Sequence, residues 1–335
     1  MKKAAWIGTT KIRDVYPASL RESLEGELEF PLGEEILTPA DFEKNADTLR
    51  EVTYLFSTWG MPKVTGEEID TYFPALKAVF YAAGTVQAFA RPFIERGVAV
   101  FSAWAANGVP VAEFTFAEII LANKGFFSLM HAPASGPDWK RGHGEGLYDG
   151  NYETKIGIIG AGMIGKMVIE RLKTLDKVEV LVFDPFLPDE KAAQLGVRKV
   201  PLTTVFEECT IISNHLANNA QTVGMLNADC FDRMSPSAVF INTGRGAQVV
   251  EDDLIAALKA EPARVALLDV TYPEPPKPES ELYRLPNVIL TPHIAGSLHH
   301  EIHRMAEYMA EEFHAFDAGL PTRYSVSLKM LETMA

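Results

Sequence analysis

The sequence has few cysteines and no long apolar run, and both shortages restrict what the protein can be. Its only two cysteines among 335 residues, Cys209 and Cys230, form neither a CxxC pair nor a disulfide framework. We therefore expect a reducing compartment and a cytoplasmic location. No run reaches the roughly 18 apolar residues of a membrane span. Lys11 and Arg13 soon interrupt the apolar run at the N-terminus, so it is a strand candidate rather than a signal peptide, and we expect no membrane partner.

Basic charge is also scarce. Lysine and arginine number 31 against 45 acidic residues, which gives a formal net charge of −14. A chain this acidic repels polyanions unless it carries a local basic patch, and the sequence shows none, so we expect no nucleic-acid partner. Hydrophobic residues make up 47% and charged residues 23%, which is typical of a globular protein. The length favours two domains rather than one core.

Two series of short apolar segments alternate with polar or helix-like stretches. The first series comprises 4–8, 52–57, 78–83 and 98–103. The second comprises 155–160, 178–184, 210–214, 238–243, 264–270 and 287–291. Strands that alternate with helices pair in parallel, so we predict an α/β protein with two doubly wound parallel-sheet domains. Between the series, a long helix is expected after Pro110, followed by an exposed loop over 131–154.

The second series opens with a glycine turn, Gly160-x-Gly162-x-x-Gly165, between a strand and an amphipathic helix. In a dinucleotide-binding turn the glycines permit a tight turn, close approach of backbone to pyrophosphate, and close packing of helix on strand. The next strand ends at Asp184, where a carboxylate would bind a ribose 2′-hydroxyl and repel a 2′-phosphate. This pattern favours NAD over NADP. The alternative is a structural glycine turn in a nucleotide-free domain.

Polar side chains follow three later strands of the second series. Arg245 follows 238–243, Asp269 and then Glu274 follow 264–268, and His293 follows 287–291. Ligands of open parallel sheets bind beyond the carboxyl ends of the strands, so these groups are expected to converge. The set suits hydride transfer to a 2-oxo acid: His293 donates a proton, Glu274 favours the imidazolium, and Arg245 clamps the carboxylate. Asp269 is a candidate to hold the nicotinamide carboxamide. Alone, each residue also suits a structural cap or a surface ion pair.

Five stretches then match one family in order and spacing: "GIIGAGMIGK", "VFDP", "INTGRGAQVVEDDLIAALK", "LLDVTYPEP" and "LPNVILTPHIAG". The chain resembles the D-isomer-specific 2-hydroxyacid dehydrogenases, densely over about 105–320 and more weakly over 1–104. The resemblance implies an NAD-binding Rossmann domain, 105–294, inserted into a smaller flavodoxin-like substrate domain formed by 1–104 and 295–335. It implies NAD-dependent interconversion of a 2-oxo acid and a D-2-hydroxy acid in a cleft between the domains, by a homodimer.

The resemblance also assigns residues. It implies that Arg245, Glu274 and His293 are the catalytic trio. The residues implied at the cofactor are Gly160, Gly162, Met163, Ile164, Gly165, Asp184, His215, Thr243, Gly244, Asp269 and Gly296.

The chain departs from this family in the turn that binds the substrate carboxylate, commonly A-G-x-G-x-D. The sequence here has Val86 and Ala88 in place of the second glycine and the aspartate, which leaves Gly84 and Thr85 as the substrate-binding candidates. Aromatic residues crowd this domain, and most are expected in its core. Trp59 and Trp104 follow candidate strands, and if they line the cleft a bulky or apolar 2-oxo acid fits better than a small one. The aromatics expected on this side of the protein are Phe56, Trp59, Tyr81, Phe89, Phe93, Phe101 and Trp104.

Two other functions remain open at this level: an NAD(H)-sensing scaffold for partner proteins, and a related enzyme such as a formate dehydrogenase. Three further histidines, His299, His300 and His303, are expected on an amphipathic helix that begins near Ser297 as its N-cap. His299 and His303 have metal-ligand spacing, but no third ligand is near in the sequence, so we expect no metal.

Overall fold

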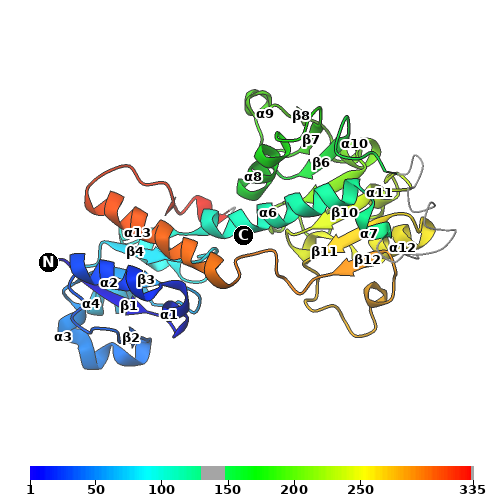
Figure 1. The fold of residues 1–335 in the computed structure, drawn as a ribbon. Coiled ribbons are helices and arrows are strands. Elements are labelled where there is room, and N and C mark those ends of the chain that lie inside the picture. Colours follow the sequence, from blue (N-terminus) through cyan, green and yellow to red (C-terminus); the bar gives the residue numbers. More distant parts are fainter. Residues whose placement is uncertain (130–147, 333–335) are drawn as a thin grey trace. The chain divides into compact units, whose positions relative to one another are not determined.

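The computed structural model describes residues 1–129 and 148–332, and the loop expected over 131–154 lies largely outside this part. The chain forms two compact units (Figure 1). The first unit comprises Met1–Gly108 and Ser297–Ala335, and the second comprises Val109–Gly296. The chain passes from the first unit into the second within the long helix α6 (Trp104–Asn123).

The first unit is built on a six-stranded sheet with the order β13-β5-β4-β3-β1-β2. Its strands are β1 (Lys3–Ile7), β2 (Ile36–Leu37), β3 (Val52–Ser57), β4 (Ala78–Tyr81), β5 (Ala99–Ser102) and β13 (Ser325–Val326). The first five pair in parallel and β13 adds an antiparallel edge. Central strands of a sheet that is covered on both faces bury side chains on both sides, which explains their nearly continuous apolar sequence.

Helices cover both faces of this sheet. One face packs against α1 (Lys11–Val15), α2 (Ala18–Glu27) and α13 (His303–Asp317). The other packs against α3 (Ala46–Leu49), α4 (Gly66–Tyr72) and α5 (Ala90–Ile94). Aromatic rings fill the first face: Phe80 stacks on Phe56 at 5.2 Å and on Phe101 at 5.1 Å between ring centroids. Most of the aromatics in the sequence of this unit are therefore core residues.

The second unit is a seven-stranded, fully parallel sheet with the order β12-β11-β10-β9-β6-β7-β8. Its strands are β6 (Lys155–Ile159), β7 (Glu179–Phe183), β8 (Arg198–Lys199), β9 (Ile211–Asn214), β10 (Val239–Asn242), β11 (Val265–Leu268) and β12 (Val288–Leu290). The order runs outward from β6 to β8 and then restarts at β9 on the other side of β6. Such a reversal marks the place where doubly wound sheets bind ligands.

Both faces of the second sheet are also covered by helices. One face packs against α6, α8 (Met163–Leu172) and α9 (Asp189–Leu195). The other packs against α10 (Leu202–Glu208), α11 (Ala228–Phe231) and α12 (Glu251–Ala260). The short helix α7 (Phe126–Leu129) follows α6. The predicted class of two doubly wound α/β domains is thus confirmed.

Helix α6 is the one helix in the described part that is long and apolar enough to cross a membrane. Half of its apolar window is buried inside the protein. Length and composition alone are weak evidence for a span, because a helix that packs in a core passes the same test. Ala112, Ile119 and Ala122 of α6 belong to the core of the second unit, and this packing accounts for the apolar sequence.

The predicted helix start at Ser297 is wrong. A 3₁₀ turn over His299–Ile302 precedes α13, and the Ser297 hydroxyl has no hydrogen-bond partner in the described part of the chain. Leu298 takes the N-cap position of this turn, and its backbone N–H donates to Oε2 of Glu301, the third residue of the turn, at 2.9 Å. The apolar stripe that was predicted for this helix is present, since Met305, Met309 and Phe313 are buried.

Candidate active site

The glycine turn after β6 has a shape that only glycine permits. Gly160 has φ +92°, and a Cβ there would lie 2.7 Å from the carbonyl oxygen of His215. A Cβ on Gly165 would lie 2.0 Å from the carbonyl oxygen of Gly160. At Gly162, by contrast, a Cβ would meet nothing within 4 Å. The first and third glycines allow close packing, and the second borders open space where a ligand can approach the backbone.

The N-terminus of α8 faces this open space with unpaired donors. Within the described part of the chain, the backbone N–H groups of Met163, Ile164 and Gly165 make no hydrogen bond. Free N–H groups and the positive end of the helix dipole attract a pyrophosphate. These residues therefore fit the phosphates of a dinucleotide.

Asp184 lies at the end of β7, next to the glycine turn. Its Oδ2 accepts a hydrogen bond from Ala161 N at 2.8 Å, and its Oδ1 accepts one from Phe186 N at 2.8 Å. Two backbone donors hold the carboxylate in one orientation, and each oxygen keeps a lone pair for a further donor. This arrangement agrees with the predicted contact to a ribose 2′-hydroxyl.

His215 follows β9 and is nearly buried. Its Nε2 lies 3.0 Å from Ser213 Oγ, and its Nδ1 is buried without a partner in the described part. Burial lowers the pKa of His215 to about 4, so the ring is neutral at physiological pH and is no acid catalyst. Its carbonyl oxygen limits the space at Gly160, which connects the end of β9 to the glycine turn.

The ends of β9 and β10 are joined by buried side-chain amides. Asn214 Nδ2 donates to Asn242 Oδ1 at 3.0 Å and to Gln248 Oε1 at 2.6 Å. The Gly244 N–H donates to Asn242 Oδ1 at 3.1 Å. Thr243, only 6% exposed, shares a 2.9 Å hydrogen bond with a threonine hydroxyl of α6. This network supports the sheet edge at which Thr243 and Gly244 were predicted to meet the cofactor.

The central pair of the site is His293 with Glu274. His293 Nδ1 lies 2.7 Å from Glu274 Oε1, and both side chains are about half exposed. An ionised carboxylate accepts a hydrogen bond from Nδ1–H, which leaves Nε2 as the nitrogen that can exchange a proton with a ligand. His293 has φ +54°, an uncommon backbone conformation for a residue with a side chain. Such outliers persist where the surroundings hold them.

Asp269 holds the turn that carries His293. The residue is only 3% exposed, and its carboxylate accepts hydrogen bonds from Thr291 Oγ1 at 2.6 Å, Ile294 N at 2.8 Å and Ala295 N at 2.9 Å. The His293 N–H also donates to the Asp269 carbonyl oxygen at 3.1 Å. The sequence marked Asp269 as a strand-end acid but did not reveal this anchoring role. Its contact with a nicotinamide carboxamide stays a prediction.

Sequence reasoning also missed Glu118, on the α6 face near this aspartate. Its Oε2 is buried and has no partner in the described part of the chain. Burial, and then the negative charge of Asp269, raise the pKa of Glu118 to about 8. The signal that was available is an acid at the centre of the apolar stretch "FTFAEIILAN".

Arg245 begins the turn after β10, and its side chain is exposed. Its Nη1 donates to the neighbouring Gly244 carbonyl oxygen at 2.7 Å. Next to it, a Cβ on Gly246 would lie 2.0 Å from the backbone of Thr271. This close approach brings the arginine turn against the segment that leads to Glu274. Arg245, Glu274 and His293 thus follow the three neighbouring strands β10, β11 and β12.

In the first unit, the predicted substrate turn follows β4. The N–H groups of Gly84 and Thr85 make no hydrogen bond in the described part of the chain, and Thr85 is exposed. The Ser102 hydroxyl donates to the carbonyl oxygens of Ala83 and Gly84, which fixes the carbonyl groups of this turn. Val86, where the family commonly has glycine, is fully buried in the core. The substitution is therefore compatible with free donors at the turn.

The aromatic residues near this turn divide into core and surface. Trp59, after β3, is 39% exposed, whereas Trp104 is partly buried and packs edge-on against Tyr324 at 5.7 Å. Thr58 Oγ1 donates to the Ala82 carbonyl oxygen at 2.7 Å, which ties the Trp59 segment to the turn after β4. The aromatics that the structure buries are Phe56, Tyr81, Phe89, Phe93 and Phe101.

The glycine turn, the free helix N-terminus and the strand-end acid together define a dinucleotide-binding α/β protein. The family model described as "D-isomer specific 2-hydroxyacid dehydrogenase, NAD binding domain" matches residues 119–295. The chain belongs to the D-isomer specific 2-hydroxyacid dehydrogenase family. The second unit corresponds to its NAD-binding domain, and NAD is the cofactor.

Relatives cover different shares of the chain. D-3-phosphoglycerate dehydrogenase of Archaeoglobus fulgidus is 32% identical over 239 residues, 71% of this chain and 44% of that protein. Glyoxylate reductase of Korarchaeum cryptofilum is 36% identical over 168 residues, 50% of each chain. The chain thus spans about half the length of these relatives. The solved structure of apo D-mandelate dehydrogenase from Rhodotorula graminis has the same fold, with a TM-score of 0.78, 21% identity and coverage of 98% of both chains.

Proposed function

We propose that the protein is an NAD-dependent oxidoreductase that interconverts a 2-oxo acid and a D-2-hydroxy acid. The observation that carries the proposal is the His293–Glu274 pair at 2.7 Å, on the same sheet edge as the glycine turn. A histidine whose Nδ1 is held by a carboxylate is suited to move a proton at Nε2. The names of the two relatives support the substrate class, because D-3-phosphoglycerate is a 2-hydroxy acid and glyoxylate is a 2-oxo acid.

The proposed roles follow the charge that develops during reduction. When bound, NADH would supply the hydride, and the carbonyl oxygen of the substrate would gain negative charge. His293 Nε2 gives its proton to that oxygen, and Glu274 stabilises the imidazolium before the transfer. In the oxidative direction, the same nitrogen accepts the hydroxyl proton. Arg245 binds the substrate carboxylate and polarises the carbonyl, because a guanidinium is a rigid fork of donors that is always charged.

We propose that the free N–H groups of Gly84 and Thr85 also bind the substrate carboxylate. The nearby exposed side chain of Trp59 favours a substrate whose 2-oxo acid carries a bulky or apolar group. We propose a cytoplasmic homodimer, supported by two buried free thiols and by the exposed apolar side chains of Leu121 and Phe126 in the second unit.

The test is NADH oxidation by the purified protein with a panel of 2-oxo acids from glyoxylate to phenylpyruvate. We expect turnover, with higher kcat/KM for apolar and aromatic members than for glyoxylate. An NAD(H)-sensing scaffold, the alternative function, predicts tight NADH binding with no turnover of any member. If glyoxylate is the preferred substrate, the proposed reaction still stands, but the role of Trp59 in substrate choice is rejected.

A further inference from the structure

The segment that follows α13 returns to the substrate turn of the first unit. It is held at its start by Glu312, a residue only 3% exposed, whose carboxylate accepts hydrogen bonds from the backbone N–H groups of Arg323 and Tyr324 at 3.0 to 3.1 Å. Strand β13 then pairs antiparallel with β5, and a 3₁₀ turn over Met330–Glu332 follows. Residues 323–332 are called the return segment below.

The return segment meets the substrate turn just after its free donors. The Gln87 side chain donates from Nε2 to the Leu331 carbonyl oxygen at 2.5 Å. Leu331 is only 5% exposed and belongs to the same apolar core as the fully buried Val86. Val86 and Gln87 directly follow Gly84 and Thr85, whose N–H groups make no hydrogen bond in the described part of the chain.

Ser102, at the end of β5, also connects the return segment with the turn. Its N–H donates to the Tyr324 carbonyl oxygen at 3.1 Å, and its hydroxyl donates to the carbonyl oxygens of Ala83 and Gly84. The turn is therefore linked to the return segment before its free donors through Ser102, and after them through Gln87.

The free donors need this support because they are proposed to bind a carboxylate. Ordering a turn costs conformational entropy, and a turn that is already ordered in the free protein does not lose this free energy when a ligand binds. Gly84 has no side chain that would restrict its backbone, and a Cβ there would meet nothing within 4 Å. The order of this turn therefore depends on its neighbours.

We propose that the return segment is a structural part of the substrate site and that Gln87 is a positioning residue. Its bond to Leu331 holds the N–H groups of Gly84 and Thr85 in the orientation that binds the substrate carboxylate. This role deepens the proposed function and rests on it, because it requires a 2-oxo acid at these donors. All 2-oxo acids share the carboxylate, so a loss of positioning weakens the binding of every one of them alike.

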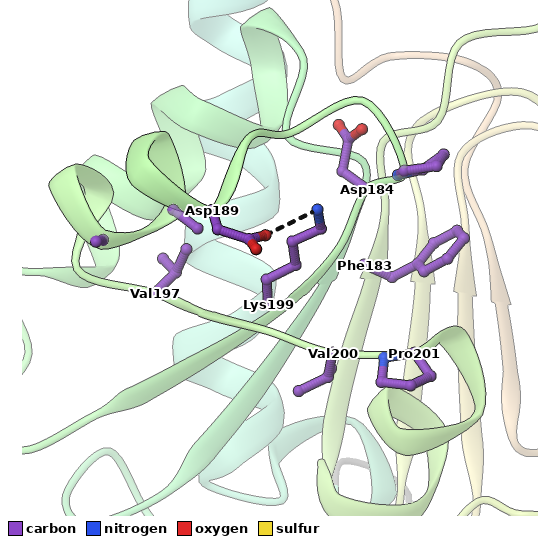
Figure 2. Close-up of a pocket in the computed structure, with 10 residues that line it drawn as sticks. Phe183, Asp184, Asp189, Val197, Lys199, Val200 and Pro201 are labelled. Carbon is purple, nitrogen blue, oxygen red and sulfur yellow. Dashed lines mark hydrogen bonds and ion pairs between the residues drawn. The ribbon is translucent and has the colours of Figure 1, made fainter.

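Gln87→Met nearly keeps the length of the side chain and removes the donor. We expect KM to rise by a similar factor for every 2-oxo acid of the panel, roughly tenfold, while kcat and the dissociation constant for NADH stay within about a factor of two. A role in stability alone would lower the melting temperature and leave KM of the folded protein unchanged. Gln194→Met is the matched control, because Gln194 is exposed on α9 of the second unit and does not line the cavity beside Asp184 (Figure 2).

A shortened chain, 1–328, breaks the same link from the other side. It lacks Leu331 and keeps Val326, which pairs with β5. We expect KM to rise at least as much as in the Gln87→Met protein. Gln87→Met added to the shortened chain is expected to have no further effect on KM, because the bond that it removes is already absent.

The possible failures are distinguishable. If Gln87→Met has the natural KM for the panel, the positioning role is refuted while the proposed function stands. If Gln87→Met raises KM by the same factor in the full and the shortened chain, Gln87 acts without the return segment and the proposal is again refuted. If the natural protein turns over no 2-oxo acid, the proposed function fails and the positioning role fails with it. Thermal melting checks folding, and Leu331→Ala replaces the shortened chain if that chain does not fold.

Discussion

Asp269 anchors the turn that carries His293, so its removal is expected to lower both stability and turnover. Asp269→Ala removes the acceptor of three hydrogen bonds and leaves two backbone N–H groups without this acceptor, that of Ala295 buried and that of Ile294 partly buried. Bonds to charged groups contribute about 1.5–3 kcal/mol each and are not fully additive, so we expect a loss of about 3–5 kcal/mol in the free energy of unfolding. Asp269→Asn keeps one oxygen and places an amide donor against a backbone donor, so its loss is about 1–3 kcal/mol.

The assay is urea unfolding of both variants, together with NADH-dependent turnover. Because the turn carries His293, we expect kcat to fall at least about tenfold in the alanine variant, which corresponds to ~1.4 kcal/mol of activation free energy. Asp252→Asn, an exposed acid on α12, is the control and changes stability by less than about 1 kcal/mol. A stable Asp269→Ala protein with normal kcat would refute the anchoring role.

Three more perturbations follow from the site. Arg245→Ala is expected to raise KM for the 2-oxo acid and to lower kcat/KM by about 10²-fold or more, while the dissociation constant for NADH stays within a few-fold. Unchanged steady-state kinetics would show that Arg245 does not bind the substrate carboxylate. Gly246→Ala places a methyl group 2.0 Å from the backbone of Thr271 and is expected to cost roughly 2–4 kcal/mol in urea unfolding; a neutral effect would contradict the close approach. Glu118→Gln changes the pH dependence of stability. The pKa of Glu118 in the folded protein, about 8, lies above the usual glutamate value of 4.5, so the native state holds the proton longer and stability falls as pH rises between these values. The glutamine variant, which cannot ionise, is expected to exceed the natural protein in stability by roughly 4–5 kcal/mol at pH 9 and to match it near pH 4; parallel pH curves would reject the raised pKa.

Much of the second unit was predictable because local and global signals agree there. Its longer strands are short apolar runs; β6 is followed by the glycine turn and the others by a polar residue. The two-residue strands were missed. Arg198–Lys199 has no apolar alternation, and it forms a strand only because β7 offers an edge to pair with.

The candidate site also has a part that the sequence predicts and a part that it does not. The catalytic and cofactor candidates lie at strand ends, which sequence order locates. The contacts that position them join distant segments, as Asp269 does with Ile294 and Ala295, and no local pattern encodes them. The same limit explains the wrong N-cap. Ser297 has good intrinsic capping propensity, but the Glu301 carboxylate reaches the Leu298 N–H and the helix begins later.

In the proposed reaction His293 moves the proton during hydride transfer, and replacing this histidine tests that role directly. His293→Ala and the control His300→Ala, an exposed histidine of the neighbouring 3₁₀ turn, are compared in single-turnover NADH oxidation with the best 2-oxo acid of the panel. We expect the rate of the His293 variant to fall by about 10²–10⁴-fold, with NADH binding retained and the control near the natural rate. A His293→Ala protein that oxidises NADH at a near-normal rate would contradict the account.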